Sequence, residues 1–590
     1  MAILTEQESN RELTLNGTVT GEKGKDASLS SENEDTVPQQ LGDIEGFDSD
    51  QAAGLAKMEA ITLVWTKNWL ITAYALIWAI SFVNSLQQQA NWSWKPYVTS
   101  EFLLHGLTGM TDVVAQIVGG VSKLPLAKFI DLVGRLQGFL VCLICVTLAL
   151  LLMTICENVQ TFAAAQVFYW SGMNGIDYIF NIFIADTSLL ENRLIWMALQ
   201  GTPYICNTFA GPSLGEKFLK DSSWRWGYGA FTIITPVVGA LFWAVFWWME
   251  RRAKLTGMIK KEKSDRTLLQ SIWHWAVEFD VIGLVLVCGG FSLFLLPFNL
   301  AALQKKGWGS PMIICMLVFG LVLIALFMVW ERFFALKSFF PFHLMKDRSV
   351  VAACFLGANS FIVFYSYKGY YSSYLQVAFG LSVAKAGYIT NIYSLVSCTW
   401  AVAISFAFKY TDTYKWGAVV ALPIQVLMTG LLIKFRQPGT AIGLLVMVEV
   451  FIAMCGAVFV QIETMAIMAA VPHEHVATGL ALLAMITSVG GAIGQTICST
   501  IWTHTIPGKL LEYLPTTSRD QAKTLGGSLP AVLLLPRESL EYQAVVSAYG
   551  DVQKLMLIVA TCALVPCFLW VAMLKNYRMS EHAARKGLQA

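Results

Sequence analysis

The sequence predicts an all-α polytopic membrane protein with about fourteen transmembrane helices. Of its 590 residues, 56% are hydrophobic and only 14% are charged, whereas a soluble domain carries about a quarter charged residues. The mean hydropathy is +0.57. Apolar runs of about 20 residues, long enough to cross a bilayer as helices, recur along nearly the whole chain. These observations place most of the chain in lipid.

The predicted spans follow one another from Asn68 to the C-terminal region. Residues 1–60 precede them; they are acidic and polar, lack the apolar core of a signal peptide, and are predicted to form a disordered tail. An even number of spans puts both chain ends on the same side. The spans are expected to begin at Asn68, Leu107, Gln137, Thr161, Ile195, Tyr228, Phe279, Pro311, Ser349, Leu381, Trp416, Thr440, Val476 and Asp551.

Positive charges predict the orientation of these spans. Lys and Arg gather in the stretch from Glu250 to Trp275, in "KSFFPFHLMKDR" and in the C-terminal tail. The positive-inside rule therefore places these segments and both termini in the cytoplasm. A long outer loop, residues 502–550, is then expected before the last span. Long loops at a membrane surface are often functional, and a covering lid is the alternative.

A charged motif, "LAKFIDLVGR", lies between the second and third spans. Asp131 is followed by Gly134 and Arg135, and opposite charges at a helix junction can pair with each other and with helix ends. One interpretation is a gating cluster that stabilises one closed state of the protein. The other is a turn glycine with ordinary inner-side charges, and the spacing alone leaves both open.

Several motifs carry a resemblance to known transporters. "LAKFIDLVGR" resembles the loop-two motif of the major facilitator superfamily, with Ala127 in place of the family's first glycine. "NTFAGPSLGE" in the fifth span resembles a glycine–proline motif of the fourteen-span facilitators. From about Ala60 to Arg578 the chain is similar to the fungal siderophore–iron transporter family, through "KLPLAKFIDLVGR", "IFIADTSLLENR", "VPHEHVATGLAL" and "IWTHTIPGKLLEYLP".

The resemblance implies a major-facilitator-type fold of two six-helix halves joined by two linking helices. The expected divisions are 61–250 for the first half, 251–348 for a basic cytoplasmic loop with the linking helices, 349–578 for the second half, and 579–590 for a cytoplasmic tail. Spans one, four, nine and twelve would line a central cavity. We expect a functional monomer in the plasma membrane or in endosomal vesicles.

The function implied by the resemblance is proton-driven import of ferric siderophores. Export of glutathione or drugs is the first alternative, because "AGPSLG" resembles a motif common among antiporters. A non-transporting nutrient receptor is the second. We expect no enzymatic activity, no nucleic-acid partner and no use of ATP. The sequence contains no nucleotide-binding motif and no basic stripe of the kind that binds nucleic acid. We also expect no metal site or cofactor, with iron carried only inside the siderophore chelate.

The stretch "FYSYKGYYSSYLQ" ends the ninth span. On a continuous helix Tyr367, Tyr370, Tyr371 and Tyr374 share one face, with Lys368 beside them. One interpretation is an interfacial tyrosine belt with a snorkelling lysine. The other, favoured by the resemblance, is a vestibule wall whose rings and hydroxyls bind the siderophore. Two tyrosines close to the last span are expected to cover the same entrance: Tyr542 and Tyr549.

Ionisable residues inside predicted spans are candidates for proton coupling, because a buried carboxylate is expensive and usually faces a cavity or a partner. Glu449 near mid-depth is the first candidate, followed by Asp177 and Asp112. Solvation is the alternative for Asp112 and a structural acceptor role for Asp177, while Glu463 near the inner end is expected to be solvated. Asn91 begins a glycosylation sequon on the outer side.

Overall fold

The fold is all helical over the residues that the computed structural model describes, and it contains no strand there. The described residues are 67–123, 125–126, 129, 134–187, 196, 199–255, 277, 280–304, 306–335, 340–471 and 476–577. The long helices of the first part are α3 (Lys67–Glu101), α4 (Met110–Val121), α6 (Arg135–Ile155), α7 (Val159–Thr187), α9 (Pro203–Asp221), α10 (Trp224–Leu255), α12 (Val281–Leu300) and α13 (Pro311–Val329).

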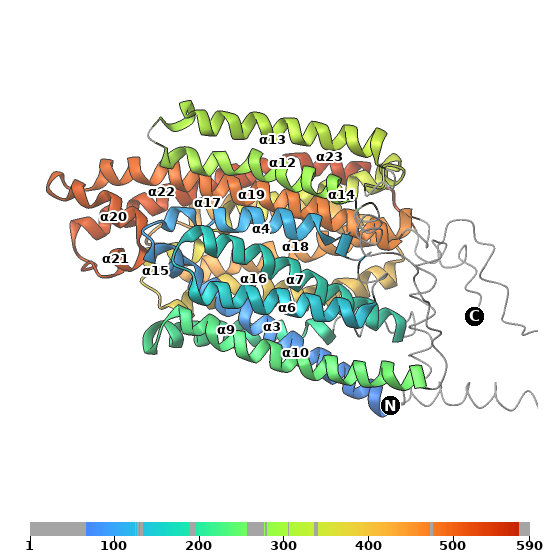
Figure 1. Ribbon diagram of the computed structural model, residues 1–590. Coiled ribbons are helices and arrows are strands. Elements are labelled where there is room, and N and C mark those ends of the chain that lie inside the picture. The colour runs from blue at the N-terminus through green and yellow to red at the C-terminus, as the bar shows by residue number, and fades with distance from the viewer. Residues whose placement is uncertain are drawn as a thin grey trace, which may run out of the picture. The chain divides into compact units, whose positions relative to one another are not determined.

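The second part of the chain repeats this pattern of long helices (Figure 1). They are α14 (Arg348–Lys368), α15 (Tyr371–Ala378), α16 (Val383–Thr411), α17 (Lys415–Phe435), α18 (Ile442–Ala470), α19 (Val476–Tyr513), α22 (Leu540–Ala563) and α23 (Val565–Met573). Shorter elements connect them: the 3-10 turns η2 (His105–Leu107), η3 (Ala301–Leu303), η4 (Gly307–Gly309), η6 (Leu344–Lys346) and η8 (Thr516–Gln521), the π-turn η5 (Trp330–Phe334), and the helices α20 (Ala522–Gly527) and α21 (Leu529–Leu533).

Most of these helices are long and apolar enough to cross a membrane. Among the described residues 11 candidate spans meet both conditions. Helices α4, α7 and α9 run alongside them and correspond to the predicted spans that begin at Leu107, Thr161 and Ile195. With these three helices included, the structure is consistent with the predicted number of spans.

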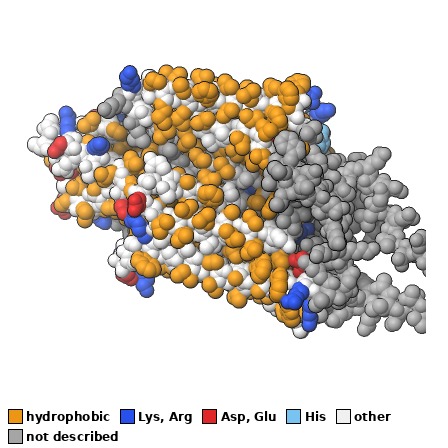
Figure 2. Space-filling view, in the orientation of Figure 1, with side chains coloured by type: hydrophobic (Ala, Val, Ile, Leu, Met, Phe, Trp, Pro, Cys, Tyr) orange, Lys and Arg blue, Asp and Glu red, His pale blue; other side chains and the backbone are white. Residues whose placement is uncertain are grey.

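The surface supports a membrane location. Figure 2 shows hydrophobic side chains over most of the visible face, with Lys, Arg, Asp and Glu mainly towards the two ends of the helices. Helix α13 exposes a largely apolar surface, because at least half of the surface of Met312, Val318, Phe319 and Leu321 is exposed. A soluble protein does not expose so continuous an apolar surface, whereas hydrocarbon solvates it without cost.

The two ends of the helix bundle differ. Helix α3 begins and helix α23 ends at the same end, which we call the terminal end (Figure 1). Helices α20 and α21 lie at the opposite end, which we call the loop end. In the predicted orientation the loop end is extracellular or luminal.

The described residues form two hydrophobic cores. One is built mainly from α3, α6, α7 and α10. The other is built mainly from the helices after α13, and α4 and α12 also contribute to it, so α4, predicted as part of the first half, packs into the core of the second. Within the second core, α14 and α19 approach closely because glycine removes side-chain bulk. A Cβ atom at Gly490 would lie 2.3 Å from the carbonyl oxygen of Ala358, and one at Gly494 would lie 2.5 Å from that of Ile362.

The segment predicted as the last outer loop, residues 502–550, is largely helical. Helix α19 continues through Pro507, and α22 begins at Leu540 rather than near Asp551, so the connection between these two long helices covers residues 514–539 and contains η8, α20 and α21. Two contacts hold the extended helix ends together: the hydroxyl of Tyr513 donates to Asp551 over 2.6 Å, and Lys509 lies 3.3 Å from the same carboxylate. These polar contacts stabilise the parts of α19 and α22 that continue beyond their apolar segments. Hydrophobicity alone could not indicate that the two helices extend so far.

Candidate functional site

The tyrosine-rich stretch is not one continuous helix. Helix α14 ends at Lys368 and α15 begins at Tyr371, while Tyr370 between them has φ −114° and ψ 16°. Gly369 occurs at the break, where its low helix propensity favours an interruption. The prediction that all four tyrosines share one face is therefore wrong, because Tyr370 is turned towards different neighbours from the others.

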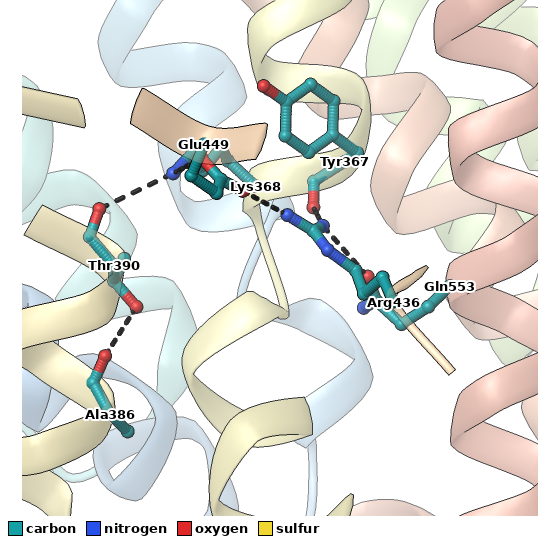
Figure 3. Close-up of polar contacts among 7 residues, drawn as sticks. All are labelled: Tyr367, Lys368, Ala386, Thr390, Arg436, Glu449 and Gln553. Carbon is teal, nitrogen blue, oxygen red and sulfur yellow. Dashed lines mark hydrogen bonds and ion pairs between the residues drawn. The ribbon is translucent and has the colours of Figure 1, made fainter. Parts of the chain in front are cut away.

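Lys368, the last residue of α14, lies in a buried cluster with Arg436 and Glu449, which we call the charge cluster (Figure 3). The Nζ atom of Lys368 lies 3.1 Å from one carboxylate oxygen of Glu449, and the Nη2 atom of Arg436 lies 2.5 Å from the other. The side chains of Arg436 and Glu449 are 0% exposed and that of Lys368 is 7% exposed. Three helices of the second half, α14, α17 and α18, meet in this cluster.

Arg436 has further partners that hold its guanidinium in place. It donates to the carbonyl oxygen of Tyr367 over 3.1 Å and to Oε1 of Gln553 over 3.3 Å. Its Cζ atom lies 3.8 Å from the ring centroid of Tyr371, a geometry in which the ring face stabilises the cation. Two cations share one carboxylate, so the cluster keeps one surplus positive charge inside the protein.

Arg436 is a residue of the cluster that the sequence pattern did not predict. In the sequence it follows an apolar run and precedes "QPGT", so it reads as an ordinary charge of an outer loop. The sequence offered one signal. Arg436 lies directly at the predicted end of the span that begins at Trp416, and the next span contains Glu449. Only the packing of α17 against α18 shows that this arginine turns inward.

The interfacial-belt interpretation of the tyrosines is wrong. Tyr367, Tyr370, Tyr371 and Tyr374 are each at most 1% exposed, so their rings contact protein rather than lipid. A role of these residues and Lys368 in substrate binding stays a prediction.

Several polar atoms of the second half are buried without a hydrogen bond from the described residues. They are the hydroxyls of Tyr374 and Tyr549, Nε2 of Gln553 and Nε1 of Trp502. A buried polar group without a partner costs about 1–3 kcal/mol. Keeping these groups unpaired costs free energy in this conformation, and in another conformation they can bind a polar molecule.

A second cluster, which we call the aromatic gate, closes the loop end. It consists of His105, Tyr370, Trp502 and Tyr549. The rings of Tyr370 and Trp502 stack at 4.1 Å with 8° between their planes, and His105 meets both edge-on at 5.7 Å. Tyr549 packs edge-on against Trp502 at 4.8 Å. The hydroxyl of Tyr370 donates to the carbonyl oxygen of Gly106 over 2.5 Å, so the gate links the two halves.

Hydrogen bonds beside the gate join the same halves. In each of them a residue of α3 or α9 contacts a residue of α15, α16 or α21. Tyr542 strengthens the second half here, because its hydroxyl donates to the carbonyl oxygen of Val377 over 2.6 Å. The loop end is thus closed across the halves by the pairs Tyr97–Gln376 (2.6 Å), Ser213–Tyr388 (2.5 Å), Glu216–Ala384 (2.7 Å) and Ser100–Leu529 (3.0 Å).

The gate contains a titratable group outside the spans. Burial lowers the pKa of His105 from its usual 6.5 to about 4, and a backbone hydrogen bond at Pro96 opposes the shift only in part. The closed gate therefore holds neutral histidine. An exposed imidazole binds a proton below pH 6.5, but the buried one does so only near pH 4. The stability of the closed gate is complete above pH 6.5 and falls as the pH drops towards 4.

We expect acid to open the loop end. Spin labels at two exposed positions on opposite halves, Lys220→Cys and Leu534→Cys, should move apart as the pH falls from 7.5 to 5 in a variant lacking the other cysteines. His105→Phe keeps an aromatic ring but cannot be protonated, so its label distances should not depend on pH. An equal pH response in both proteins would show that another group controls the gate.

Asp177 lines a cavity of about 250 Å³ in the first half. The cavity lies between α3, α7 and the start of α9, and its other lining residues are Ser81, Asn84, Asn181, Gln200, Gly201 and Tyr204. Six of the seven carry a polar side chain, so the cavity offers hydrogen-bond partners within a lining surface that is mostly apolar. Asp177 is thus separate from the charge cluster of the second half.

Asp112 is not solvated. It is 5% exposed and forms an ion pair with Lys95, which is also buried. The pair joins α4 to α3 near the loop end. This contact corrects the alternative that Asp112 lies in water, and it shows that the carboxylate has a fixed cationic partner.

Two further expectations are corrected. Glu463, expected to be solvated, is 3% exposed, because α18 packs its terminal-end half between α14 and α19. Asn91, the predicted glycosylation candidate, lies inside α3, is 5% exposed and accepts a hydrogen bond from Tyr228. The helix continues past the sequon to Glu101, so this asparagine is packed inside the protein.

The predicted gating motif is described only in part. Asp131 lies outside the described residues. Gly134 precedes α6 with φ 106°, a conformation that favours glycine, and Arg135 is the first residue of that helix. Within the described part of the chain, no group of three or more His, Cys, Asp or Glu side chains is arranged to hold a metal ion.

Comparisons with known proteins agree with this architecture. Residues 77–342 match the family model of the Major Facilitator Superfamily. The chain is 42% identical to "MFS siderochrome iron transporter 1" of Ajellomyces capsulatus over 95% of this chain and 96% of that protein. It is 37% identical to "MFS siderochrome iron transporter D" of Aspergillus fumigatus (90% and 88% covered) and 36% identical to "Siderophore iron transporter mirB" of Emericella nidulans (91% and 89% covered).

Solved structures share the fold at low sequence identity. A bacterial homologue of the human lysosomal transporter Spinster has a TM-score of 0.52 at 12% identity, covering 86% of this chain and 97% of that chain. The peptide transporter POT in complex with sulfate has a TM-score of 0.54 at 12% identity, covering 85% and 96%. At this identity the likeness concerns the helix arrangement alone.

Proposed function

The chain belongs to the siderochrome iron transporters of the major facilitator superfamily, and we propose that it imports ferric siderophores by proton-coupled secondary transport. The observation that carries the proposal is the 42% identity that extends over 95% of this chain and 96% of a relative with that name. The similarity thus extends over nearly the whole length of both chains. The protein is a multi-pass membrane transporter, and its family is not a class of enzymes.

The charge cluster suits a chelate rich in oxygen. Its surplus positive charge attracts carbonyl, hydroxamate or carboxylate oxygens, and Arg436 can bind two of them at once through its planar fork. The unpaired hydroxyls of Tyr374 and Tyr549 and the amide of Gln553 offer further hydrogen bonds. We propose that the substrate binds between these groups when the aromatic gate opens.

The same cluster offers a mechanism for coupling. Substrate oxygens that bind Lys368 and Arg436 compete with the carboxylate of Glu449 for these cations. A carboxylate that loses both cationic partners inside an apolar protein is costly as an anion, so substrate binding favours proton uptake by Glu449. By linkage, a proton on Glu449 frees both cations and favours substrate binding by the same factor.

Transport further requires that the two ends open in turn. We propose that the aromatic gate opens the loop end to the outside, and that the Asp131–Arg135 motif stabilises a closed terminal end. The closed loop end and the Asp177 cavity support a conformation that releases substrate towards the cytoplasm. The predicted orientation, with both termini cytoplasmic, makes this direction import.

The test is uptake of radioactive ferric siderophores by yeast cells that lack their own siderophore transporters. Cells that express the protein should accumulate iron from at least one of ferrichrome, coprogen and triacetylfusarinine C, and a protonophore should stop the accumulation. Binding without accumulation would indicate a receptor. Faster loss of preloaded siderophore, glutathione or dye would indicate an exporter and would overturn the proposal.

A further inference from the structure

Helix α18 carries two buried carboxylates on one face. Glu449 and Glu463 are separated by fourteen residues, which is about 40° short of four full turns and about 21 Å along the helix. Gly456 stands midway between them, seven residues from each. The three positions form a stripe that runs from the charge cluster towards the terminal end.

The surroundings of the two carboxylates differ. Glu449 pairs with two cations. For Glu463 the described residues supply no cation within ion-pair distance, and its one hydrogen bond comes from the hydroxyl of Ser360 over 3.4 Å. A buried negative charge on a carboxylate that has a single neutral hydrogen-bond donor is costly in free energy. A carboxyl group that binds and releases a proton fits this environment.

The space around Glu463 is prepared for a polar contact. A Cβ atom at Gly357 would lie 3.0 Å from Oε2 of Glu463 and 2.8 Å from Oγ1 of Thr487, so both side chains reach into the space that this glycine leaves empty. The Oγ1 atom of Thr487 is buried and has no hydrogen-bond partner in the described residues. Thr487 is thus a polar neighbour of Glu463, but no hydrogen bond from it stabilises a charged Glu463 carboxylate.

A tyrosine of α16 lies between the two carboxylates. The hydroxyl of Tyr393 occupies the space at Gly456, where a Cβ atom would be only 2.0 Å away. The ring of the same tyrosine lies 5.6 Å from Nζ of Lys368. Tyr393 therefore contacts the charge cluster at its ring and the middle of the α18 stripe at its hydroxyl.

We propose that Glu463 is a second proton-carrying group of the transporter, connected to Glu449 through Tyr393 and releasing the coupled proton towards the terminal end. The proposal rests on the proposed function, since it assigns the path of the coupling ion. The proton binds the Glu463 carboxylate, leaves it as the terminal end opens, and no other bond changes. The other titratable groups that face Glu463 are the thiols of Cys354 and Cys567 and the phenol of Tyr393.

The test uses the full-length protein in liposomes that contain a pH-sensitive dye, with ferrichrome labelled with radioactive iron as the probe. Wild-type protein should move protons inward when ferrichrome is added, and it should concentrate ferrichrome when the outside is acidic. Glu463→Gln should exchange ferrichrome at equal concentrations within twofold of wild type, but lose at least tenfold of its concentrative uptake and its proton movement. Tyr393→Phe should slow proton movement without changing exchange.

Control variants distinguish a proton-carrying role of Glu463 from a purely structural role, and from failure of the transport proposal. Glu512→Gln neutralises an exposed carboxylate, 58% accessible, and should behave as wild type. Glu463→Asp keeps a titratable group and should restore coupling with a shifted pH profile, even if Glu463→Gln fails to reach the membrane. Normal coupling in Glu463→Gln, or no recovery in Glu463→Asp, would overturn the proposal. Absence of ferrichrome exchange by wild-type protein, with every other siderophore also failing in cells, would instead refute the proposed function.

Discussion

Replacement of Glu449 by glutamine should abolish concentrative uptake of ferric siderophore. The substitution keeps the shape of the side chain but leaves Lys368 and Arg436 buried without a carboxylate. Removing one member of a buried ion pair costs about 3–5 kcal/mol, so we also expect less protein at the cell surface. Uptake per surface molecule, measured with a protonophore as the reference, should fall at least tenfold.

A compensating variant separates coupling from folding. Glu449→Gln combined with Lys368→Met restores the original net charge of the cluster, because it removes one negative and one positive group. We expect the double variant to recover surface level, since Arg436 is again the single surplus cation, but not concentrative uptake. If uptake also returned to normal, the cluster would be structural and the proposed coupling role of Glu449 would be wrong.

Replacement of Trp502 by alanine should hold the loop end open. Trp502 contacts Tyr370, His105 and Tyr549, and each aromatic pair contributes about 0.5–1.5 kcal/mol beyond burial of its area. Loss of these contacts shifts the equilibrium away from the closed gate. We expect more ferric siderophore bound to intact cells at low temperature, together with at least tenfold slower uptake at normal temperature.

Two variants control for the size and place of this tryptophan. Trp502→Phe keeps an aromatic ring in the stack and should recover most of the uptake. Trp226→Ala removes a tryptophan that is 66% exposed on α10 and should change neither binding nor uptake. Binding and uptake of Trp502→Ala equal to those of wild type would mean that the aromatic gate does not limit access.

The arrangement of the tyrosine-rich stretch could be predicted from the sequence only in part. A helical wheel placed four tyrosines on one face, but the helix break at Tyr370 splits them between two sites. Tyr367 and Tyr371 contact Arg436, whereas Tyr370 stacks on Trp502 in the aromatic gate. The wheel assumes a constant rotation per residue, and Tyr370, which lies outside helical geometry, departs from it while Tyr367 and Tyr371 still meet at Arg436.

The carboxylates show a related limit. Their position along each span was predictable, because depth follows from the number of residues at a fixed rise. Their partners were not, because Glu449 meets Lys368 and Arg436 from two other helices and Asp112 meets Lys95 from a third. Glu463 was expected in water because it lies near a helix end, yet α14 and α19 cover it.

The sequence by itself determined the membrane-spanning helical fold and the family. The length and hydrophobicity of a segment determine the free energy of placing it in lipid. That free energy depends on the residues of the segment itself. The tertiary structure alone decided which charges pair, which tyrosines close the loop end, and that Arg436 points inward. These properties depend on distances between helices far apart in the chain, and a one-dimensional pattern carries no measure of those distances.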